Sequence, residues 1–299
     1  MRKIASVIVT YNRSELLKEC ISALVNLNTT TDIFVVDNAS TDNTEEIVVG
    51  FIVDNKNVFY YKMQNNIGGA GGFNYGIRKA YEAGYEYIWL MDDDTIVKSD
   101  TLEELLKIGD SVDNNFGWLS SLALWTDGKE CVMNWHDVDK EWNCDKKGIL
   151  EGRLLCQGAT FVSLLIHRKA VSECGLPIKE YFIWGDDTEY TQRIAQEFPC
   201  YFAPRSQVIH KMKSNEGTGR FEEIENIDRI ERMYYSIRND FCTYKRKGVI
   251  QTIKFVYGEM KVFKRVIFSN RRYKWKKVWV MLKGLWAGIW FHPKIEKVH

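Results

Sequence analysis

Apolar and polar positions follow two alternating patterns over the first hundred residues. Four short runs are rich in branched and aromatic side chains, as buried strands are, and they lie at 4–9, 33–36, 58–61 and 87–91. Between these runs, apolar residues recur at helical spacing, for example at Leu17, Ile21 and Leu24. This order predicts an α/β fold in which a mostly parallel sheet is flanked by helices and ligands bind at the carboxyl ends of the strands.

Local signals indicate where the helices begin. Ser14 is expected to cap the first helix. The next helices are expected from 41 or 42 to 49, over 72–83 after a glycine-rich start, and from about 101. The pattern is less regular from about 110 to 220. We therefore expect one domain over 1–220, with halves at about 1–110 and 111–220, and a helical region over 221–299.

Three consecutive carboxylates, Asp92, Asp93 and Asp94, close the buried run at 87–91. Their like charges repel one another, and a strand does not need this for stability. A divalent cation removes the repulsion, and Asp92 and Asp94 can point to the same side because they are two residues apart. The alternative is a solvated acidic turn. A cation held here predicts a diphosphate ligand.

His210 follows another short apolar run, at 207–209. A single histidine is more often structural. If the aspartates hold a metal, however, a neutral imidazole would complete the ligand shell and favour a transition ion such as Mn²⁺.

A second acidic cluster lies at 184–190, where Trp184 and Gly185 precede Asp186, Asp187 and Glu189. It opens an amphipathic helix, so one of these carboxylates is expected to act as a helix cap. Capping does not account for three acids beside a tryptophan. A carboxylate here is a candidate general base for a sugar hydroxyl, with aromatic faces packing against sugar rings.

The glycine-rich segment 65–72 is typical of loops that approach a phosphate. It follows the third predicted strand and lacks the GxGxxG spacing, which disfavours a dinucleotide site. Its glycines allow either close approach of a ligand or close packing.

The chain carries a net charge of only +1, but its charge is unevenly distributed. From Thr243 onward there are fifteen Lys or Arg and two Asp or Glu, against 26 and 38 before it. The body is therefore at about −12 and the tail at about +13, which predicts a basic surface for an anionic partner.

The segment 271–291 mixes tryptophans with lysines, as helices in anionic membrane interfaces do. Packing as a helical subdomain or oligomer contact and binding of nucleic acid are the alternatives, and we expect the membrane rather than nucleic acid. Five residues that precede the segment 271–291 also recur at helical spacing, and they are Arg232, Tyr234, Tyr235, Arg238 and Asn239. Two interpretations are open: they form the core and surface of an ordinary helix, or they contact an anionic ligand.

The seven cysteines are odd in number and show no Cys-x-x-Cys spacing, which is typical of reduced thiols. A strand is predicted from Ile4, which leaves no room for a signal peptide, and no apolar run reaches the ~20 residues of a membrane span. We therefore expect a cytoplasmic protein whose contact with the cell membrane is peripheral.

Together these motifs resemble those of family 2 glycosyltransferases with the GT-A fold, and the resemblance covers about residues 1–215. The matching segments are 6–13, 35–42, 65–72, 92–94 and 184–190. Within the family, the glycine segment, the Asp triplet and the tryptophan-acid stretch are similar to bacterial galactofuranosyltransferases, with rhamnosyltransferases as close relatives. Gly185 departs from the expected pattern, since it separates Trp184 from the acid pair.

The resemblance implies a role for each matching residue. Asp187 would be the general base and Asp186 its neighbour; Asp92, Asp94 and His210 would bind Mn²⁺ or Mg²⁺. Trp184, Asp186 and Glu189 would contact the acceptor. Donor-binding residues would be Thr10, Tyr11, Arg13, Asp37, Asn38, Asn66, Gly71, Gly72, Asp92 and Asp93, with Asp37 accepting from the uracil or thymine N–H.

The expected reaction is an inverting, metal-dependent transfer of galactofuranose from UDP-galactofuranose to a glycan acceptor, carried on a lipid, in bacterial polysaccharide assembly. Transfer of rhamnose from dTDP-rhamnose is the first alternative, and a non-catalytic sugar-nucleotide or membrane module is the second. The segment 211–225 is either a mobile lid or an ordinary surface loop, and a homo-oligomer is compatible with the sequence.

Overall fold

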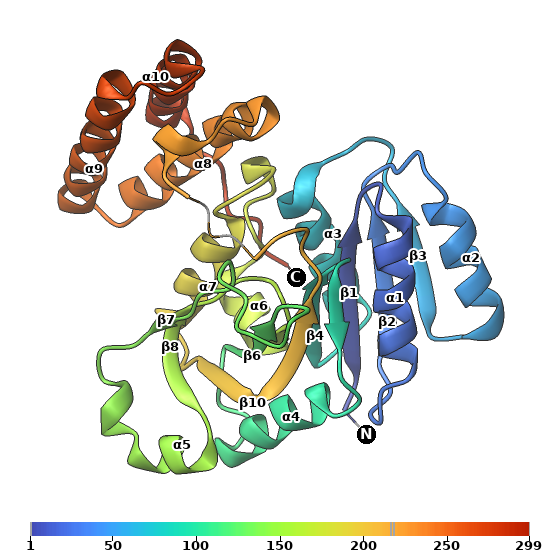
Figure 1. Cartoon of the computed structure of the whole chain (residues 1–299). Helices are drawn as coiled ribbons and strands as arrows, with labels where there is room; N and C mark the ends of the chain where they lie inside the picture. Colours follow the sequence, from blue (N-terminus) through green and yellow to red (C-terminus); the bar gives the residue numbers. More distant parts are fainter. Residues whose placement is uncertain (1, 216, 218, 299) are drawn as a thin grey trace. The chain divides into compact units, whose positions relative to one another are not determined.

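The computed structural model describes residues 2–215, 217 and 219–298, and its contacts divide the chain into two compact units (Figure 1). Unit 1 consists of residues 2–179, 187–215 and 295–298. Unit 2 consists of residues 180–186, 217 and 219–294.

The first part of unit 1 alternates strands and helices, as predicted. The strands are β1 (Ile4–Thr10), β2 (Asp32–Asp37), β3 (Val58–Lys62) and β4 (Tyr87–Asp92). The helices are α1 (Ser14–Val25), α2 (Thr44–Asp54), α3 (Gly68–Glu82) and α4 (Thr101–Ser111). The four strands pair in parallel in the order β3-β2-β1-β4. Their carboxyl ends therefore lie along one edge of the sheet.

The second part of unit 1 extends the same sheet with mixed pairing. Its strands are β5 (Thr95–Val97), β6 (Trp118–Leu124), β7 (Asp137–Val138), β8 (Leu154–Gly158), β9 (Leu164–His167) and β10 (Tyr201–His210). Its helices are α5 (Lys146–Glu151), α6 (Arg168–Cys174) and α7 (Asp186–Ala195), whose first residue belongs to unit 2. Beyond β4 the order is β9-β6-β10-β8-β7, with β9 antiparallel to both β4 and β6, while β10 is parallel to β6.

Alternation along the central strands produces two hydrophobic cores, one on each face of the sheet. On β1, Val7 and Val9 belong to the core that includes α3 and α7. Ile8 belongs to the core that includes α1 and α4. A strand that is buried on both faces reads as a continuous apolar run, which is why β1 and β4 were recognisable in the sequence.

Several predicted helix boundaries are wrong. Ser14 does not cap α1 but is its first helical residue, and its backbone N–H donates to the Asp42 carboxylate at 3.0 Å. The second helix begins at Thr44 and ends at Asp54. The third begins at Gly68, so the glycine segment forms its first turn instead of preceding it. The glycine segment was expected to form a loop before this helix, but close packing outweighs the low helix propensity of glycine here.

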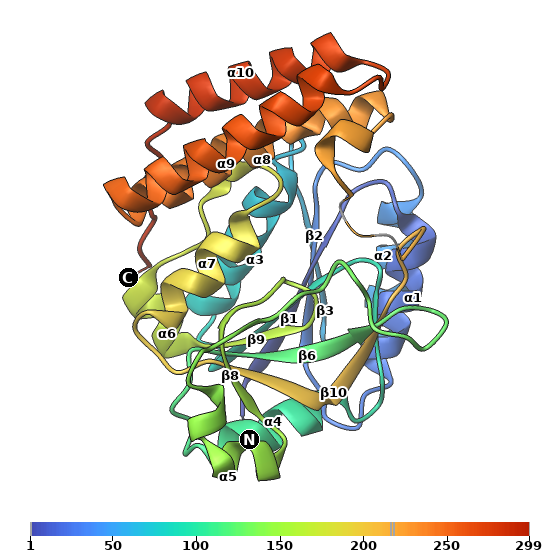
Figure 2. The same ribbon diagram turned by 60° about the vertical axis from the view of Figure 1, so that its left-hand side comes forward.

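Unit 2 contains three long helices, α8 (Ile227–Arg246), α9 (Val249–Phe268) and α10 (Lys274–Trp290), which pack against one another (Figure 2). Their core includes Ile230, Ile237, Val266 and Met281. The segment 271–291 thus packs as a helical subdomain on one of its faces. No helix within the described part of the chain is both long and apolar enough to cross a membrane.

Candidate active site

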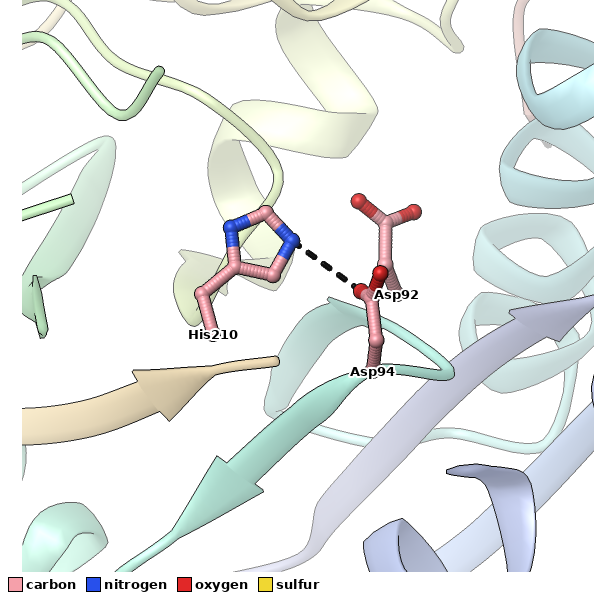
Figure 3. Close-up of side chains that lie close together, drawn as sticks. All are labelled: Asp92, Asp94 and His210. Carbon is pink, nitrogen blue, oxygen red and sulfur yellow. Dashed lines mark hydrogen bonds and ion pairs between the residues drawn. The ribbon is translucent and has the colours of Figure 1, made fainter. Parts of the chain in front are cut away.

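The Asp triplet and His210 come together through strand pairing, although they are more than a hundred residues apart. Asp92 is the last residue of β4, and the chain turns directly into β5. Strand β5 pairs antiparallel with the end of β10, with Thr95 opposite His210. The ladder continues as the Lys211 N–H donates to the Asp94 carbonyl at 2.8 Å. This pairing places the histidine beside the aspartates (Figure 3).

Asp92, Asp94 and His210 are suited to bind a metal ion. One ligand atom from each lies within 4.8 Å of the others, and Nε2 of His210 is 3.0 Å from Oδ1 of Asp94. The other ring nitrogen, Nδ1, donates to Oδ1 of Asn134 at 2.7 Å. Because this bond keeps a proton on Nδ1, the ring can give up the Nε2 proton that bonds Asp94 and offer the Nε2 lone pair to a metal ion, as a metal-ligating histidine requires. Asn134 was not predicted, because it lies in an irregular segment without a motif.

The charges of this cluster interact strongly. Burial and the neighbouring Asp94 raise the pKa of Asp92. Burial also raises the pKa of Asp93 to about 6, against the opposing effect of Arg13. Burial opposes the charged forms of Asp94 and His210 as well, but their hydrogen bond lowers the pKa of Asp94 and raises the pKa of His210. The repulsion between the three carboxylates that the sequence predicts is therefore present, and the positive charges of Arg13 and His210 reduce it.

The loop after β1 is bonded to the Asp triplet. The Thr10 hydroxyl donates to Oδ2 of Asp93 at 2.8 Å. Nη1 of Arg13 donates to Asp94 at 2.8 Å and to Asp93 at 3.2 Å, while its side chain remains half exposed. Tyr11 is exposed. Three residues predicted for the nucleotide pocket thus lie at the strand end that adjoins the metal-binding cluster.

Asp37 is fully buried at the end of β2, and both of its oxygens are bonded. Oδ1 accepts from the Ser40 N–H at 2.8 Å, and Oδ2 accepts from the Tyr60 hydroxyl at 2.5 Å. Burial and this bond raise the pKa of Tyr60. Each carboxylate oxygen has a second lone pair, but because Asp37 is fully buried a base N–H would reach it only after the surrounding side chains move. Tyr60 was not singled out from the sequence, because it belongs to an apolar run.

The residues of the glycine segment contact both the sheet and the preceding loop. The Asn38 amide donates to the Gly68 carbonyl at 3.0 Å, and Oδ1 of Asn66 accepts from the Gly68 N–H at 2.8 Å. A Cβ at Gly72 would lie 2.6 Å from a methyl of Val9. Gly71 is buried as well. Close packing of α3 against β1 is therefore one function of this segment.

The second acidic cluster occupies the start of α7. Asp187 is half-buried, and its Oδ1 accepts from the Thr188 N–H at 2.6 Å. Burial raises the pKa of Asp187, against the hydrogen bonds from Thr188. Glu189 forms two bonds with Arg193, at 2.8 and 2.9 Å. Asp186 is buried.

The turn before α7 has an unusual backbone. Phe182 and Trp184 have φ of 65°, and Gly185 has φ of 84°, in the left-handed region that favours glycine. The buried Asn239 amide donates to the carbonyls of Tyr181 and Trp184, at 2.9 and 2.7 Å, and also approaches that of Ile183. Oδ1 of Asn239 accepts from Arg238, which itself donates to the Glu180 carbonyl. Arg238 and Asn239 thus hold backbone within unit 2.

The segment 211–225, predicted as a lid or a surface loop, includes residues 216 and 218, which lie outside the described residues. Before them, Nε1 of Trp125 donates to the Met212 carbonyl at 3.1 Å. The prediction of a lid remains untested.

Comparison with known proteins agrees with this geometry. Residues 6–114 match the family model described as "Glycosyl transferase family 2". Galactofuranosyltransferase GlfT1 from Mycolicibacterium smegmatis is 26% identical over 83% of this chain and 82% of its own length. Poly-beta-1,6-N-acetyl-D-glucosamine synthase from Staphylococcus aureus is 32% identical over 32% of this chain and 23% of its own length. The mannosyltransferase PcManGT from Pyrobaculum calidifontis, solved with GDP-Man and Mn²⁺, has a TM-score of 0.58 at 16% identity and is matched over 98% of this chain and 76% of that one.

The mostly parallel sheet, its flanking helices and the aspartate cluster at the strand ends give this chain the GT-A fold, which it shares with the solved structure of PcManGT. Residues 6–114 of this fold match the glycosyltransferase family 2 model, and the chain is similar to a galactofuranosyltransferase over most of its length.

Proposed function

We propose that this protein is an inverting, metal-dependent glycosyltransferase that moves galactofuranose from UDP-galactofuranose to a glycan acceptor during assembly of a bacterial cell-surface polysaccharide. The observation that carries this proposal is the cluster of Asp92, Asp94 and His210 beside the end of β4. The similarity to GlfT1 along most of both chains supports the choice of sugar.

Asp92, Asp94 and His210 would hold the metal ion. Two carboxylates and one imidazole suit Mn²⁺ and also accept Mg²⁺, and the presence of Mn²⁺ with a sugar nucleotide in PcManGT supports such a use. When bound, the ion would supply Lewis-acid stabilisation of the departing nucleoside diphosphate.

The loops at the strand ends would bind the donor. Thr10 and Arg13 contact the Asp triplet, so the nucleotide and diphosphate sites would share one rigid framework. Buried Asp37 would accept from the imide N–H of uracil. The other donor contacts that we propose are Tyr11, Asn38, Asn66, Gly71, Gly72, Asp92 and Asp93.

Asp187 would act as the general base. Thr188 holds its Oδ1, which orients Oδ2 to take the proton from an acceptor hydroxyl. As that oxygen bonds to the anomeric carbon, the bond from this carbon to the diphosphate breaks, which inverts its configuration. We assign Trp184 and Asp186 to the acceptor. Glu189 would have to exchange its pairing with Arg193 to join them.

A binding titration tests the metal and nucleotide assignments. UDP and dTDP are each titrated into the protein with Mn²⁺ and with a chelator. We expect Mn²⁺-dependent binding with preference for UDP, strongly weakened in Asp94→Asn. Asp113→Asn is the matched control, because Asp113 is exposed and lies far from the triplet. Its neighbour Asn114 contacts Tyr87, the first residue of β4, whereas the triplet begins at the last residue of that strand.

The remaining outcomes distinguish the alternatives. Preference for dTDP would favour the rhamnosyltransferase alternative. Binding of neither nucleotide would overturn the proposal. An enzyme should release UDP from UDP-galactofuranose, and this release should require both the metal and Asp187. A non-catalytic module should release none. We further propose that the acceptor is carried on a lipid at the cytoplasmic face of the membrane.

A further inference from the structure

Helix α10 has two apolar faces, and only one of them is covered by the three-helix core. The covered face includes Val280, Met281 and Gly284. Packing there is close, because a Cβ at Gly288 would lie 2.7 Å from Cβ of Phe241 on α8. This face accounts for the subdomain packing of the C-terminal segment, but it contains none of the four tryptophans of α10.

The tryptophans form a stripe on the opposite face. Trp275, Trp279, Trp286 and Trp290 are 73%, 65%, 66% and 68% exposed, and Leu282 and Ile289 fill the spaces between them. The tryptophans are spaced by four, seven and four residues, which places them on one side of a helix. Leaving such large apolar side chains in water is unfavourable, and a contiguous exposed apolar surface of this kind indicates an interaction site.

Helix α9 lies beside α10 (Figure 2). It exposes a second stripe of apolar side chains. Its exposed apolar residues again recur at helical spacing and are Val249, Ile250, Ile253, Tyr257, Met260 and Phe268. Lys264 lies within this stripe, and Lys254 and Lys261 lie along its border. The two stripes therefore combine apolar side chains with positive charge.

The charge of this surface selects the partner. Helices α9 and α10 together carry eight basic residues and one acidic residue, and of the eight only Lys277 is buried. Tryptophan and tyrosine favour the boundary between lipid headgroups and acyl chains, and lysine side chains reach past apolar surface towards headgroups. An anionic bilayer matches both the tryptophans and the lysines.

From these observations we infer that the exposed stripes of α9 and α10 form a docking surface for an anionic lipid bilayer, with both helices lying in the plane of its interface. The tryptophans enter the headgroup region, and the basic residues contact the lipid phosphates. This surface lies within unit 2 and does not depend on the proposed transfer reaction, although it would keep the enzyme close to a lipid-linked acceptor.

Flotation of the full-length protein with lipid vesicles tests this inference. Vesicles of phosphatidylcholine alone are compared with vesicles that also contain phosphatidylglycerol. We expect binding to the anionic vesicles, a decrease with added salt, and roughly a fivefold loss for each basic residue neutralised, for example in Lys261→Gln. The double variant Trp279→Ser/Trp286→Ser should bind at least about tenfold more weakly.

The control is Trp142→Ala, which removes an exposed tryptophan from unit 1 instead of unit 2. This variant should bind the vesicles as the wild type does. Quenching of tryptophan fluorescence by lipids brominated along the acyl chain should be strong in the wild type and weaker in the double variant. Circular dichroism checks that all variants remain folded.

Two results would overturn the inference. One is equal flotation of the wild type and the double variant. The other is a stable dimer without lipid that becomes a monomer in the double variant while vesicle binding is absent, which would make this face a contact between copies of the chain. Either failure leaves the nucleotide titration unaffected, so it is distinguishable from failure of the proposed function.

Discussion

At the scale of single residues, the surroundings of each carboxylate separate its role from those of its neighbours. Asp94 contacts His210 and Arg13 and stays ionised, as a metal ligand must. Asp187 accepts hydrogen bonds from the uncharged donors of Thr188, and burial raises its pKa. A carboxylate whose charge is poorly compensated accepts a proton more readily, which suits a general base.

The raised pKa of Asp187 predicts the pH dependence of transfer. The base acts when ionised, so kcat/KM should fall as the pH drops through a pKa above the ordinary ~3.9 of aspartate. The pH profile of transfer measures this, with metal-dependent UDP binding followed over the same range as the control. An acid limb at the ordinary value, with UDP binding intact, would contradict the assignment.

Replacing this base should lower activity without lowering stability. Asp187→Asn should lower transfer by about 10² to 10⁴-fold, while UDP binding persists. The stability contribution of a carboxyl with a raised folded-state pKa is lost as the pH rises through that pKa, so removing the charge should not lower Tm at pH 7. Transfer assays and thermal unfolding test both parts. Transfer at the wild-type rate would show that another group is the base.

Asn134 should affect metal affinity without being a ligand. It fixes the tautomer and orientation of His210 through Nδ1. Asn134→Ala should weaken binding of Mn²⁺ in the presence of UDP by about 10–100-fold. Titration followed by electron paramagnetic resonance measures this affinity, and exposed Asn143→Ala is the control. Unchanged affinity would mean that Asp94 and Cys131, whose Sγ lies 3.7 Å from Nδ1, position the imidazole without Asn134.

At the scale of elements, the approach of α3 to the sheet depends on glycines. A Cβ at Gly76 would lie 2.3 Å from a methyl of Val7, whereas one at Gly50 in α2 would have nothing within 4 Å. An added methyl group would therefore clash with the sheet at Gly76 in α3 but would meet no atom at Gly50 in α2.

The two glycines provide a matched test of this packing. Gly76→Ala should lower the free energy of unfolding by about 1–3 kcal/mol through overpacking. Gly50→Ala should raise it by roughly 0.5–1 kcal/mol, because alanine favours the helix. Chemical denaturation measures both changes. Stabilisation by both substitutions would mean that α3 can move away from β1 at little cost.

The turn before α7 is a second feature at this scale, since its shape depends on a distant helix. Asn239→Ala should destabilise the protein by about 1–3 kcal/mol, because buried carbonyls of the turn lose their donor. Transfer should fall further than UDP binding, since the turn leads into Asp186 and Asp187. Chemical denaturation measures the loss of stability, and separate kcat and KM values measure the loss of transfer. If the effect were purely structural, transfer per folded molecule would be unchanged.

At the scale of the whole molecule, all seven cysteines are free thiols, as predicted, and six of them are buried. Burial raises the pKa of Cys174 to about 11 and the pKa of Cys156 to about 12, so the reactive thiolate is disfavoured at both. Exposed Cys144 is the exception.

This difference predicts the thiol reactivity of the native protein. A thiol reagent should modify one cysteine rapidly at pH 8 and all seven after denaturation. Cys144→Ser should abolish the rapid phase. Several rapid thiols in the native state would show that the core opens more readily than its packing indicates.

The sequence by itself determined the parallel half of the sheet, the Asp triplet and the second acidic cluster, because buried strands and clustered charges are visible in local composition. It also indicated His210 as a metal ligand, but only β5–β10 pairing brings that residue to Asp94. The tertiary structure alone revealed the bonds of Asn134 and Asn239 and the division of α10 into a packed face and a tryptophan face. Contacts between residues far apart in the chain decide these features, and no local pattern encodes them.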